Sequence, residues 1–338
     1  MAARAEHRVG LLGAGRIGRL HAENAGRIAG LLVAAVADTD AEAARRLADH
    51  LGCEAVADWG ALLRRDDIGA VFICSPPGAH AEQVALAAGE HKHVFCEKPL
   101  AADVQSADRA LAAVEAAGTI LQIGYNRRFD RNFRAVRDAV AAGRVGRPCV
   151  LRISSRDPEP PPRDYLEISP GLFFDTTSHD LDLARFLLAD EIAEVSAFGA
   201  TLFSDDVRAV GGVDTAVTTA VFAGGALAVI DNCWRSTYGY DQRVELHGTE
   251  GMVGAGNEVS NTTVVGDGDG FHTPVLPHFF ADRYGPAFVR EVEAFAAALD
   301  GAPVPVTGRD GRQALAAAAA ARRSHEERRP VALDGLVR

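Results

Sequence analysis

The sequence contains only two lysines, Lys92 and Lys98, although it carries 35 lysine and arginine residues. The other 33 are therefore arginines, and an ordinary surface cation in this chain is expected to be Arg. Lys92 lies between two histidines and is interpreted as a solvated turn residue before a strand. Lys98 needs another explanation, because a buried lysine, unlike an arginine, can lose its proton near neutral pH and exchange it with a substrate.

Long apolar runs and paired cysteines are also missing. No run approaches the roughly 20 apolar residues that a bilayer crossing requires, and residues 1–8 do not lead into a signal-peptide core. A cytoplasmic protein with no membrane partner is therefore expected. The scattered cysteines contain no CxxC pair, which indicates reduced thiols rather than a disulfide framework or a metal site. They are Cys53, Cys74, Cys96, Cys149 and Cys233.

The charge balance is acidic, with a formal net charge of −11 at pH 7. Nucleic acids bind basic protein surfaces, so a nucleic-acid partner is not expected. A length of 338 residues is too great for a single core and predicts two domains. The 48% hydrophobic and 24% charged composition is typical of a globular protein.

A glycine-rich turn follows the first apolar run, residues 9–12. Gly13, Gly15 and Gly18 form GxGxxG with Arg16 and Ile17 inside it, and a helical pattern continues to about residue 28. An isolated GxGxxG is a weak signal, and an ordinary turn is the alternative. Here a second apolar run, 31–37, ends in an acidic residue 25 positions after the first glycine. This spacing predicts a dinucleotide site with the pyrophosphate at the helix N-terminus.

The acidic residue at the end of that run is Asp38, which is expected to accept hydrogen bonds from the ribose hydroxyls. Its carboxylate would repel the 2′-phosphate of NADP, and Thr39 and Asp40 follow it where an arginine would favour NADP. The predicted cofactor is NAD.

Strands and helices continue to alternate up to residue 123. Such repeated units predict a parallel sheet covered by helices on both faces, with ligands bound beyond the carboxyl ends of the strands. The Gly13 turn, residues 75–78 and residues 97–99 are therefore expected on one rim. The sequence predicts helices at 41–51, 59–63, 80–89 and 107–117, and strands at 31–37, 71–74, 93–96 and 120–123.

Three segments together resemble the Gfo/Idh/MocA oxidoreductase family: GAGRIGR at 13–19, ICSPPGAH at 73–80 and EKP at 97–99. Within the family, the inositol dehydrogenases are the most similar group. The resemblance implies an α/β fold: a Rossmann doubly wound parallel sheet, placed at 1–124, followed by an α+β domain with a large open mixed sheet at 125–338. One face of that sheet holds the substrate site and the other packs on a second subunit, which implies a homotetramer. The C-terminal helices, expected at 283–299 and 312–323, return to cover the sheets.

The resemblance also implies roles for residues near the rim. Lys98 corresponds to the family's active-site lysine, and Pro99 is expected to be cis. Ser75, Pro76, His80 and Glu97 are expected to contact the cofactor. For His80, a helix-start cap is an almost equal alternative.

The second half contains the other candidate groups. Asn126 and Arg127 match a segment that lies over the substrate in inositol dehydrogenases. Tyr240 matches a tyrosine that contacts the polyol there, although packing of a loop is an equal alternative. A helix is expected at 132–142, a strand at 149–154, an irregular proline-rich loop at 157–162, and strands at 215–222, 226–232 and 243–247.

Asp175 and His179 stand four residues apart at the start of a predicted helix, so they share one face. A carboxylate beside an imidazole can orient the ring and stabilise its charged form. Alone, such a pair is more often a helix cap. In the family, this pair meets the lysine of Glu-Lys-Pro, which implies an acid–base site of Lys98, Asp175 and His179. Asp180 and Asp182 are interpreted as helix-surface or structural residues, and Ser178 and Pro170 depart from the family pattern.

These features predict an NAD-dependent oxidoreductase that oxidises a cyclitol, with myo-inositol converted to 2-keto-myo-inositol (scyllo-inosose) as the first choice. Whether Lys98 or His179 is the formal base stays open. One alternative is a dehydrogenase of another cyclitol, an amino-cyclitol or a pyranose in a biosynthetic pathway. A second is a non-catalytic NAD-binding sensor.

Overall fold

The structure, a computed structural model, describes residues 6–333. The chain divides into two compact units. The first contains the chain up to Phe129 together with Pro286–Leu315, and the second contains Asp130–Gly285 together with the chain from Ala316. Two long helices, α10 (Phe280–Leu299) and α11 (Gly308–Glu327), therefore contribute residues to both units.

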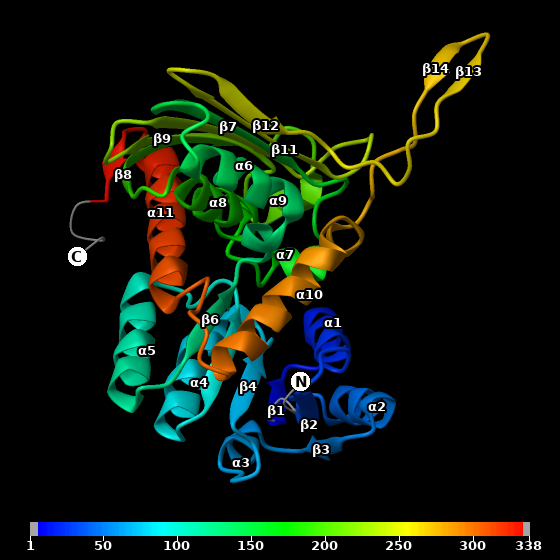
Figure 1. The fold of residues 1–338 in the computed structure, drawn as a ribbon, viewed down its shortest axis with the longest axis vertical. Helices are drawn as coiled ribbons and strands as arrows, with labels where there is room; N and C mark the ends of the chain where they lie inside the picture. Colours follow the sequence, from blue (N-terminus) through cyan, green and yellow to red (C-terminus); the bar gives the residue numbers. More distant parts are fainter. Residues whose placement is uncertain (1–5, 334–338) are drawn as a thin grey trace. The chain divides into compact units, whose positions relative to one another are not determined.

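The first unit alternates short strands and helices through most of its length (Figure 1). Its elements are β1 (His7–Leu12), α1 (Arg16–Ala25), β2 (Leu31–Ala37), α2 (Ala41–Leu51), β3 (Glu54–Val56), α3 (Trp59–Leu63), β4 (Ala70–Ile73), α4 (Pro77–Gly89), β5 (His93–Glu97), α5 (Val104–Ala117), β6 (Leu121–Gly124) and the 3₁₀ turn η1 (Asn126–Phe129).

The six strands of this unit form one sheet in the order β3-β2-β1-β4-β5-β6, and every pair is parallel. The order changes direction at β1, which has β2 on one side and β4 on the other. The turns after β1, β4 and β5 consequently emerge at the same edge. This arrangement confirms the predicted doubly wound parallel sheet and places its ligand-binding crevice at the carboxyl ends of these strands.

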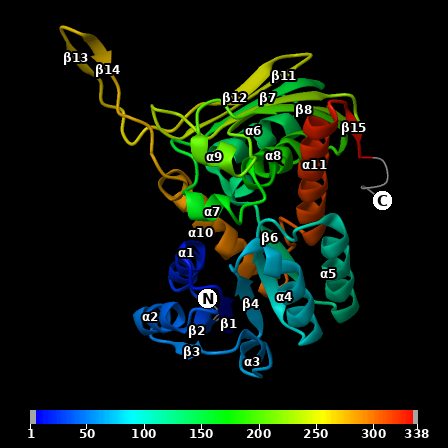
Figure 2. The same cartoon turned by 180° about the vertical axis from the view of Figure 1, so that it is seen from behind.

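The two faces of the sheet are covered by different helices. Residues of α1 and α2 pack on one face in a core that also contains Phe72, Phe95, Val292 and Phe295. On the other side, α4 and α5 lie next to each other (Figures 1 and 2). Phe72, Phe95 and Phe295 form mutual ring contacts at centroid distances of 5.1–5.9 Å. The returning helix α10 thus completes the core of the first unit.

The second unit is built around a seven-stranded sheet. Its elements are α6 (Arg131–Ala141), β7 (Pro148–Arg156), α7 (Arg163–Leu166), the π-helical turn η2 (Phe173–Thr177), α8 (Ser178–Leu188), β8 (Ile192–Ala200), α9 (Asp205–Ala209), β9 (Thr215–Phe222), β10 (Leu227–Cys233), β11 (Asp241–Gly248), β12 (Met252–Ala255), the hairpin β13 (Val265–Asp267) and β14 (Gly270–His272), and β15 (Val331–Ala332).

This sheet has the order β12-β11-β7-β10-β9-β8-β15 and is mixed, because β7 and β10 run parallel while the other pairs are antiparallel. Helices α6 and α8 lie side by side on one face (Figures 1 and 2). Residues of β9 alternate between buried and exposed positions, as expected for a sheet packed on one side only. The structure confirms the predicted α+β architecture with an open mixed sheet.

Most predicted element positions are confirmed, and the differences have local causes. Helix α5 begins three residues before the predicted start, because Asp103 caps it by accepting a hydrogen bond from the Ser106 N–H. Helix α4 begins at Pro77, a favoured first helical residue. No element was predicted for the three-residue β3, for α7 or for α9, which Ser204 caps. The Lys98–Pro99 peptide is cis, as expected.

The five cysteines are free thiols. Across residues 6–333, no helix combines the length and the apolar character that a membrane crossing needs.

Candidate active site

The glycines of the turn after β1 are required by close packing. Gly13 has φ +99°, and a Cβ there would lie 2.6 Å from the carbonyl of Cys74. A Cβ on Gly18 would lie 1.9 Å from the Gly13 oxygen. Only glycine fits at these two positions, so the turn brings β1, α1 and the end of β4 into direct contact.

Gly15 differs from its neighbours because a Cβ there would have no atom within 4 Å. Gly15 is also the N-cap of α1, where it supplies no side chain to bond the first-turn N–H groups. Unsatisfied N–H groups and the helix dipole favour an anion at such a position. The open space at Gly15 fits the approach of a pyrophosphate to the first turn of α1, which begins with Arg16 and Ile17.

Asp38 lies at the end of β2, where its carboxylate shapes the same turn. One oxygen accepts the Ala14 N–H at 2.6 Å and the other accepts the Asp40 N–H at 2.8 Å. The side chain is partly exposed, so further acceptor positions on the carboxylate face solvent. This geometry leaves room for the ribose hydroxyls that Asp38 is predicted to bind.

His80 connects two segments of the rim. Its ring is buried, with Nδ1 2.7 Å from the Pro99 oxygen and Nε2 2.7 Å from the Ser75 oxygen. Burial lowers the pKa of His80, although both carbonyl contacts favour the charged ring. The residue is inside α4, whose N-cap is Pro76, so the helix-cap alternative is wrong. His80 instead fixes the distance between the turns after β4 and β5.

The turn after β5 carries Glu97 and Lys98. The Glu97 carboxylate accepts the Lys98 N–H at 3.1 Å and lies 2.6 Å from Nε2 of His21. Lys98 is half-buried at this edge of the sheet. The polar segment after β6 is the turn η1, in which Asn126 and Arg127 are both buried. All these residues belong to the first unit.

In the second unit, Asp175 lies in the π-helical turn η2 and His179 follows in the first turn of α8. The sequence predicted one regular helix, whereas the chain is wider here and π turns are frequent at functional sites. Asp175 accepts hydrogen bonds from the Tyr165 hydroxyl at 3.1 Å and from the Ser169 hydroxyl. Both side chains of the predicted pair are only partly buried. Tyr165 and Ser169 are contacts that sequence reasoning missed.

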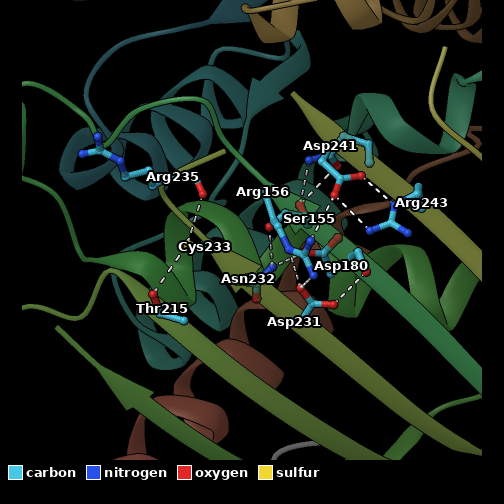
Figure 3. A network of polar contacts seen from close by, with 12 residues as sticks. Ser155, Arg156, Asp180, Thr215, Asp231, Asn232, Cys233, Arg235, Asp241 and Arg243 are labelled. Carbon is cyan, nitrogen blue, oxygen red and sulfur yellow. Dashed lines mark hydrogen bonds and ion pairs between the residues drawn. The ribbon is translucent and has the colours of Figure 1, made fainter. Parts of the chain in front are cut away.

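A buried polar network holds the chain between Asp175 and His179 and just after His179, and Figure 3 shows its Asn232 and Asp180 side chains. Asn232 of β10 accepts the Thr177 hydroxyl at 2.7 Å and donates to the Asp180 carboxylate at 2.7 Å. The indole of Trp234 donates to the Thr176 hydroxyl at 2.9 Å. Asp180 is fully buried, so the interpretation of Asp180 as a helix-surface residue is wrong, while its structural interpretation fits.

Asp182 and Ser178 are also directed inward. Asp182 is buried and lies 3.7 Å from Arg185, which is further paired with Glu191. Ser178, which departs from the family pattern, donates its hydroxyl to the Phe174 carbonyl at 2.5 Å. The departure therefore adds a contact within the helix.

Tyr240 is 6% exposed and its ring meets Tyr284 edge-on at 6.0 Å. The preceding Gly239 has φ +113°, and a Cβ there would collide with Leu276. Asp241, which follows Tyr240, is fully buried and accepts hydrogen bonds from Arg243 (Figure 3). It also accepts hydrogen bonds from the Asn257 amide and the Tyr238 hydroxyl. Burial raises the pKa of Asp241, but these donors outweigh it and the pKa lies below its usual range. Tyr240 is therefore held at a fixed position next to a charged network.

The first unit is thus a dinucleotide-binding fold, and the second unit is an open sheet that presents a carboxylate and an imidazole from one helical segment. Family comparison gives the same division. Residues 7–125 match the model of an oxidoreductase family with an NAD-binding Rossmann fold, and residues 133–254 match the GFO/IDH/MocA C-terminal domain. The chain belongs to the Gfo/Idh/MocA oxidoreductase family.

Curated relatives are similar along nearly the whole chain. Myo-inositol 2-dehydrogenase of Thermotoga maritima is 42% identical over 332 residues, with 98% of this chain and 99% of the relative covered. Inositol 2-dehydrogenase of Rhizobium meliloti is 42% identical over 327 residues, covering 96% of this chain and 99% of the relative.

Solved structures agree with these relatives. A probable dehydrogenase from Thermotoga maritima superposes with a TM-score of 0.94 at 41% identity, covering 97% of this chain and 99% of the other. Two Lactobacillus casei structures contain ligands: a scyllo-inositol dehydrogenase with NAD(H) and scyllo-inositol (TM-score 0.91, 28% identity, 97% and 99% covered), and a myo-inositol dehydrogenase with NAD(H) and myo-inositol (TM-score 0.88, 29% identity, 97% and 96% covered).

Proposed function

We propose that this chain is an NAD-dependent inositol 2-dehydrogenase that oxidises myo-inositol to 2-keto-myo-inositol. The observation that carries the proposal is 42% identity to the Thermotoga maritima myo-inositol 2-dehydrogenase along 98% of the chain. The Lactobacillus casei structures with NAD(H) and an inositol support the same cofactor and substrate class.

The cofactor would be held by the rim of the first unit. Gly13, Gly15 and Gly18 would let the pyrophosphate approach α1, with Arg16 and Ile17 in its first turn. Asp38 would accept the ribose hydroxyls and reject NADP. Ser75, Pro76, His80 and Glu97 would shape the nicotinamide side, His80 by fixing two turns and Glu97 through the Lys98 backbone. When bound, NAD supplies the hydride acceptor.

The acid–base groups would be Lys98, Asp175 and His179. His179 would accept the proton of the substrate hydroxyl, and Asp175 would orient His179 and balance its charge. Tyr165 and Ser169 support this role, because their hydroxyls hold the Asp175 carboxylate in place by donating hydrogen bonds to it. Lys98 would hydrogen-bond the reacting oxygen and relay the proton. Asn126, Arg127 and Tyr240 would bind the remaining hydroxyls.

The test follows NADH formation with NAD and with NADP across inositol isomers, amino-cyclitols and aldoses. Lys98→Ala and His179→Ala should each lower turnover by about 10²-fold or more, as expected of acid–base groups. Lys92→Gln is the lysine control, because Lys92 belongs to no proposed site. Lys92 is buried and its ammonium donates to the Arg65 carbonyl at 2.8 Å, so its interpretation as a solvated residue is wrong. Wild-type turnover in both Ala variants would contradict the assignment. The pH profiles of Lys98→Gln and His179→Gln identify the formal base. Replacement of the base should remove the fall in kcat that the wild type shows toward acidic pH.

A second candidate substrate is scyllo-inositol, favoured by a Bacillus subtilis scyllo-inositol 2-dehydrogenase (NAD(+)) that is 33% identical over 334 residues. Higher kcat/KM for scyllo-inositol than for myo-inositol would select it. Activity on an amino-cyclitol or a pyranose alone would move the enzyme to a biosynthetic role. NAD binding without NADH formation on any polyol would indicate a sensor.

We also infer a homotetramer in which the open sheet face packs on a second subunit. Apolar side chains on that face are exposed. They lie opposite one another on neighbouring strands, where Phe198 pairs with Val217 and Leu227 pairs with Val221. Val217→Lys should lower the mass measured by light scattering, whereas Val264→Lys, also at an exposed valine, should not. The five free thiols support a cytoplasmic location.

A further inference from the structure

Three ionisable side chains from distant segments meet inside the first unit: His21 of α1, Glu97 at the end of β5 and Glu291 of α10. His21 and Glu291 are fully buried, and the Glu97 side chain is 12% exposed. Nε2 of His21 lies 2.6 Å from Glu97 and 3.8 Å from Glu291, and the ligand-type atoms of all three lie within 4.8 Å of one another. The proposed acid–base chemistry uses neither His21 nor Glu291.

The surroundings of His21 indicate which of its ring nitrogens carries the proton. Its ring contacts Phe72, Phe95 and Phe288 at centroid distances of 4.8–6.1 Å. Nδ1 is buried and has no hydrogen-bond partner among the described residues, whereas Nε2 contacts Glu97. A buried N–H without an acceptor costs more than an unused acceptor, so the proton belongs on Nε2. His21 therefore donates its Nε2–H to the Glu97 carboxylate.

Glu291 has no such donor. Both of its side-chain oxygens are buried without a hydrogen-bond partner in the described part of the chain. An ionised carboxylate here would be an unsolvated charge facing a second carboxylate, an arrangement that proteins avoid by retaining a proton. Burial raises the pKa of Glu291 well above its usual range, and the charge of Glu97 raises it further. The cluster then carries one negative charge on two carboxyl groups.

A metal ion fits these distances less well. Two ligand atoms on one zinc ion, each about 2.0–2.2 Å from it, lie more than about 3 Å apart in a tetrahedral site. The 2.6 Å separation of His21 and Glu97 is that of a charge-assisted hydrogen bond. The group therefore has the geometry of a proton-sharing cluster.

We propose that Glu291 is a positioning residue whose neutral carboxyl group, linked to Glu97 through one internal water, holds Glu97 in the orientation that fixes Lys98 at the rim of the sheet. The link to Lys98 is the Glu97 carboxylate, which accepts the Lys98 N–H at 3.1 Å and rests against Gly124. Gln122 secures Glu291 from β6 by donating its side-chain amide to the Glu291 carbonyl at 2.8 Å. The titratable groups that face Glu291 are His21 of α1, Glu97 at the end of β5 and Cys74 after β4.

This inference rests on the proposed dehydrogenase function for its kinetic test. Glu291→Gln keeps a neutral donor, so kcat and its pH profile should stay within about threefold of the wild type. Glu291→Leu removes the donor and should lower kcat about tenfold or more, because small displacements of a reacting group are costly. Glu293, exposed and two residues further along α10, supplies the matched controls Glu293→Gln and Glu293→Leu.

Equal losses in Glu291→Gln and Glu291→Leu would show that an ionised carboxylate is needed, and unchanged turnover in Glu291→Leu would remove the positioning role. A substrate-free measurement separates this result from failure of the proposed function. Infrared spectra at neutral pH should contain a protonated-carboxyl band that disappears in Glu291→Gln and persists in Glu293→Gln. Absence of that band, or an equimolar bound metal that Glu291→Gln loses, would overturn the inference. The spectral test remains decisive if Glu291→Leu does not fold.

Discussion

Replacement of Asp38 tests how this fold selects its cofactor. The Asp38 carboxylate already accepts two backbone N–H groups, from Ala14 and Asp40, at 2.6 and 2.8 Å, and the Thr39 hydroxyl at 3.4 Å. A carboxylate offers about four acceptor positions, so about one or two remain for a ribose diol. Asp38→Asn keeps one acceptor oxygen but removes the negative charge, which is the feature that repels a 2′-phosphate.

Hydrogen bonds to a charged group contribute about 1.5–3 kcal/mol each. Loss of one such bond to the ribose should therefore raise the Kd for NAD by about 10- to 100-fold in Asp38→Asn. The Kd for NADP should fall, because the repulsion is gone. Protein fluorescence titration measures both constants without turnover, so slow chemistry cannot distort the comparison as it can for KM.

A control is needed because Asp38 also shapes the turn. Asp40→Asn retains the side-chain oxygen that caps α2 by accepting the Glu42 and Ala43 N–H groups, and should leave the preference for NAD unchanged. The reasoning would be refuted by a wild type that binds NADP as tightly as NAD. It would also be refuted if Asp38→Asn weakened binding of both cofactors by the same factor.

Three further perturbations follow from the packing and charge of individual residues. Gly18→Ala places a Cβ 1.9 Å from the Gly13 oxygen, so the free energy of unfolding in urea should fall by about 1–3 kcal/mol or more. Gly15→Ala is the control, because its Cβ would lie in open space and should change the free energy of unfolding little. Asn232→Ala leaves the buried Asp180 carboxylate without its amide donor and should cost about 3 kcal/mol in the same assay. A loss below about 0.5 kcal/mol, the size of a surface effect, would contradict that network. The raised pKa of Glu291 means that the folded state binds an extra proton. The contribution of this proton to stability is complete below the pKa of the unfolded state and is lost as pH rises through the pKa of the folded state. Tm should therefore decline more steeply toward alkaline pH in the wild type than in Glu291→Gln.

Much of the first unit could be predicted from the sequence because local signals coincide there. The GxGxxG turn, the acidic residue at the end of β2 and the alternation of apolar runs each indicate the same parallel sheet, and all lie close together in the chain. The cis peptide before Pro99 came from the resemblance of a short motif. The π turn at Asp175 could not be predicted, because its helical periodicity is indistinguishable from that of an ordinary helix over so few residues.

Buried polar residues were the main error of interpretation. Asp180 and Asp182 alternate with Leu181 and Leu183, a pattern that places polar and apolar groups on opposite sides of a strand but not of a helix. In α8 all four side chains are buried. Asn232 reaches the Asp180 carboxylate from β10, whereas Asp182 is paired with Arg185 three residues further along the same helix. A polar residue inside an apolar helix segment indicates a buried partner, but its identity requires the tertiary structure.

Glu291 is a second polar residue inside an apolar helix segment, and its position indicates a buried partner even more clearly. It follows Phe288 by three residues and precedes Phe295 by four, so it occupies the apolar face of α10, whereas Glu293 occupies the exposed face. His21 likewise stands four residues from Ile17 and from Ala25 on the inner face of α1. Each residue alone is an isolated polar group on a buried helix face, and no spacing connects them, because 270 residues separate the two positions. Only packing of α10 against the core of the first unit brings them to Glu97, which neighbours the lysine that the sequence singled out. The proton proposed for Glu291 is therefore a property of the assembled core, and it links the stability of that core to the position of Lys98.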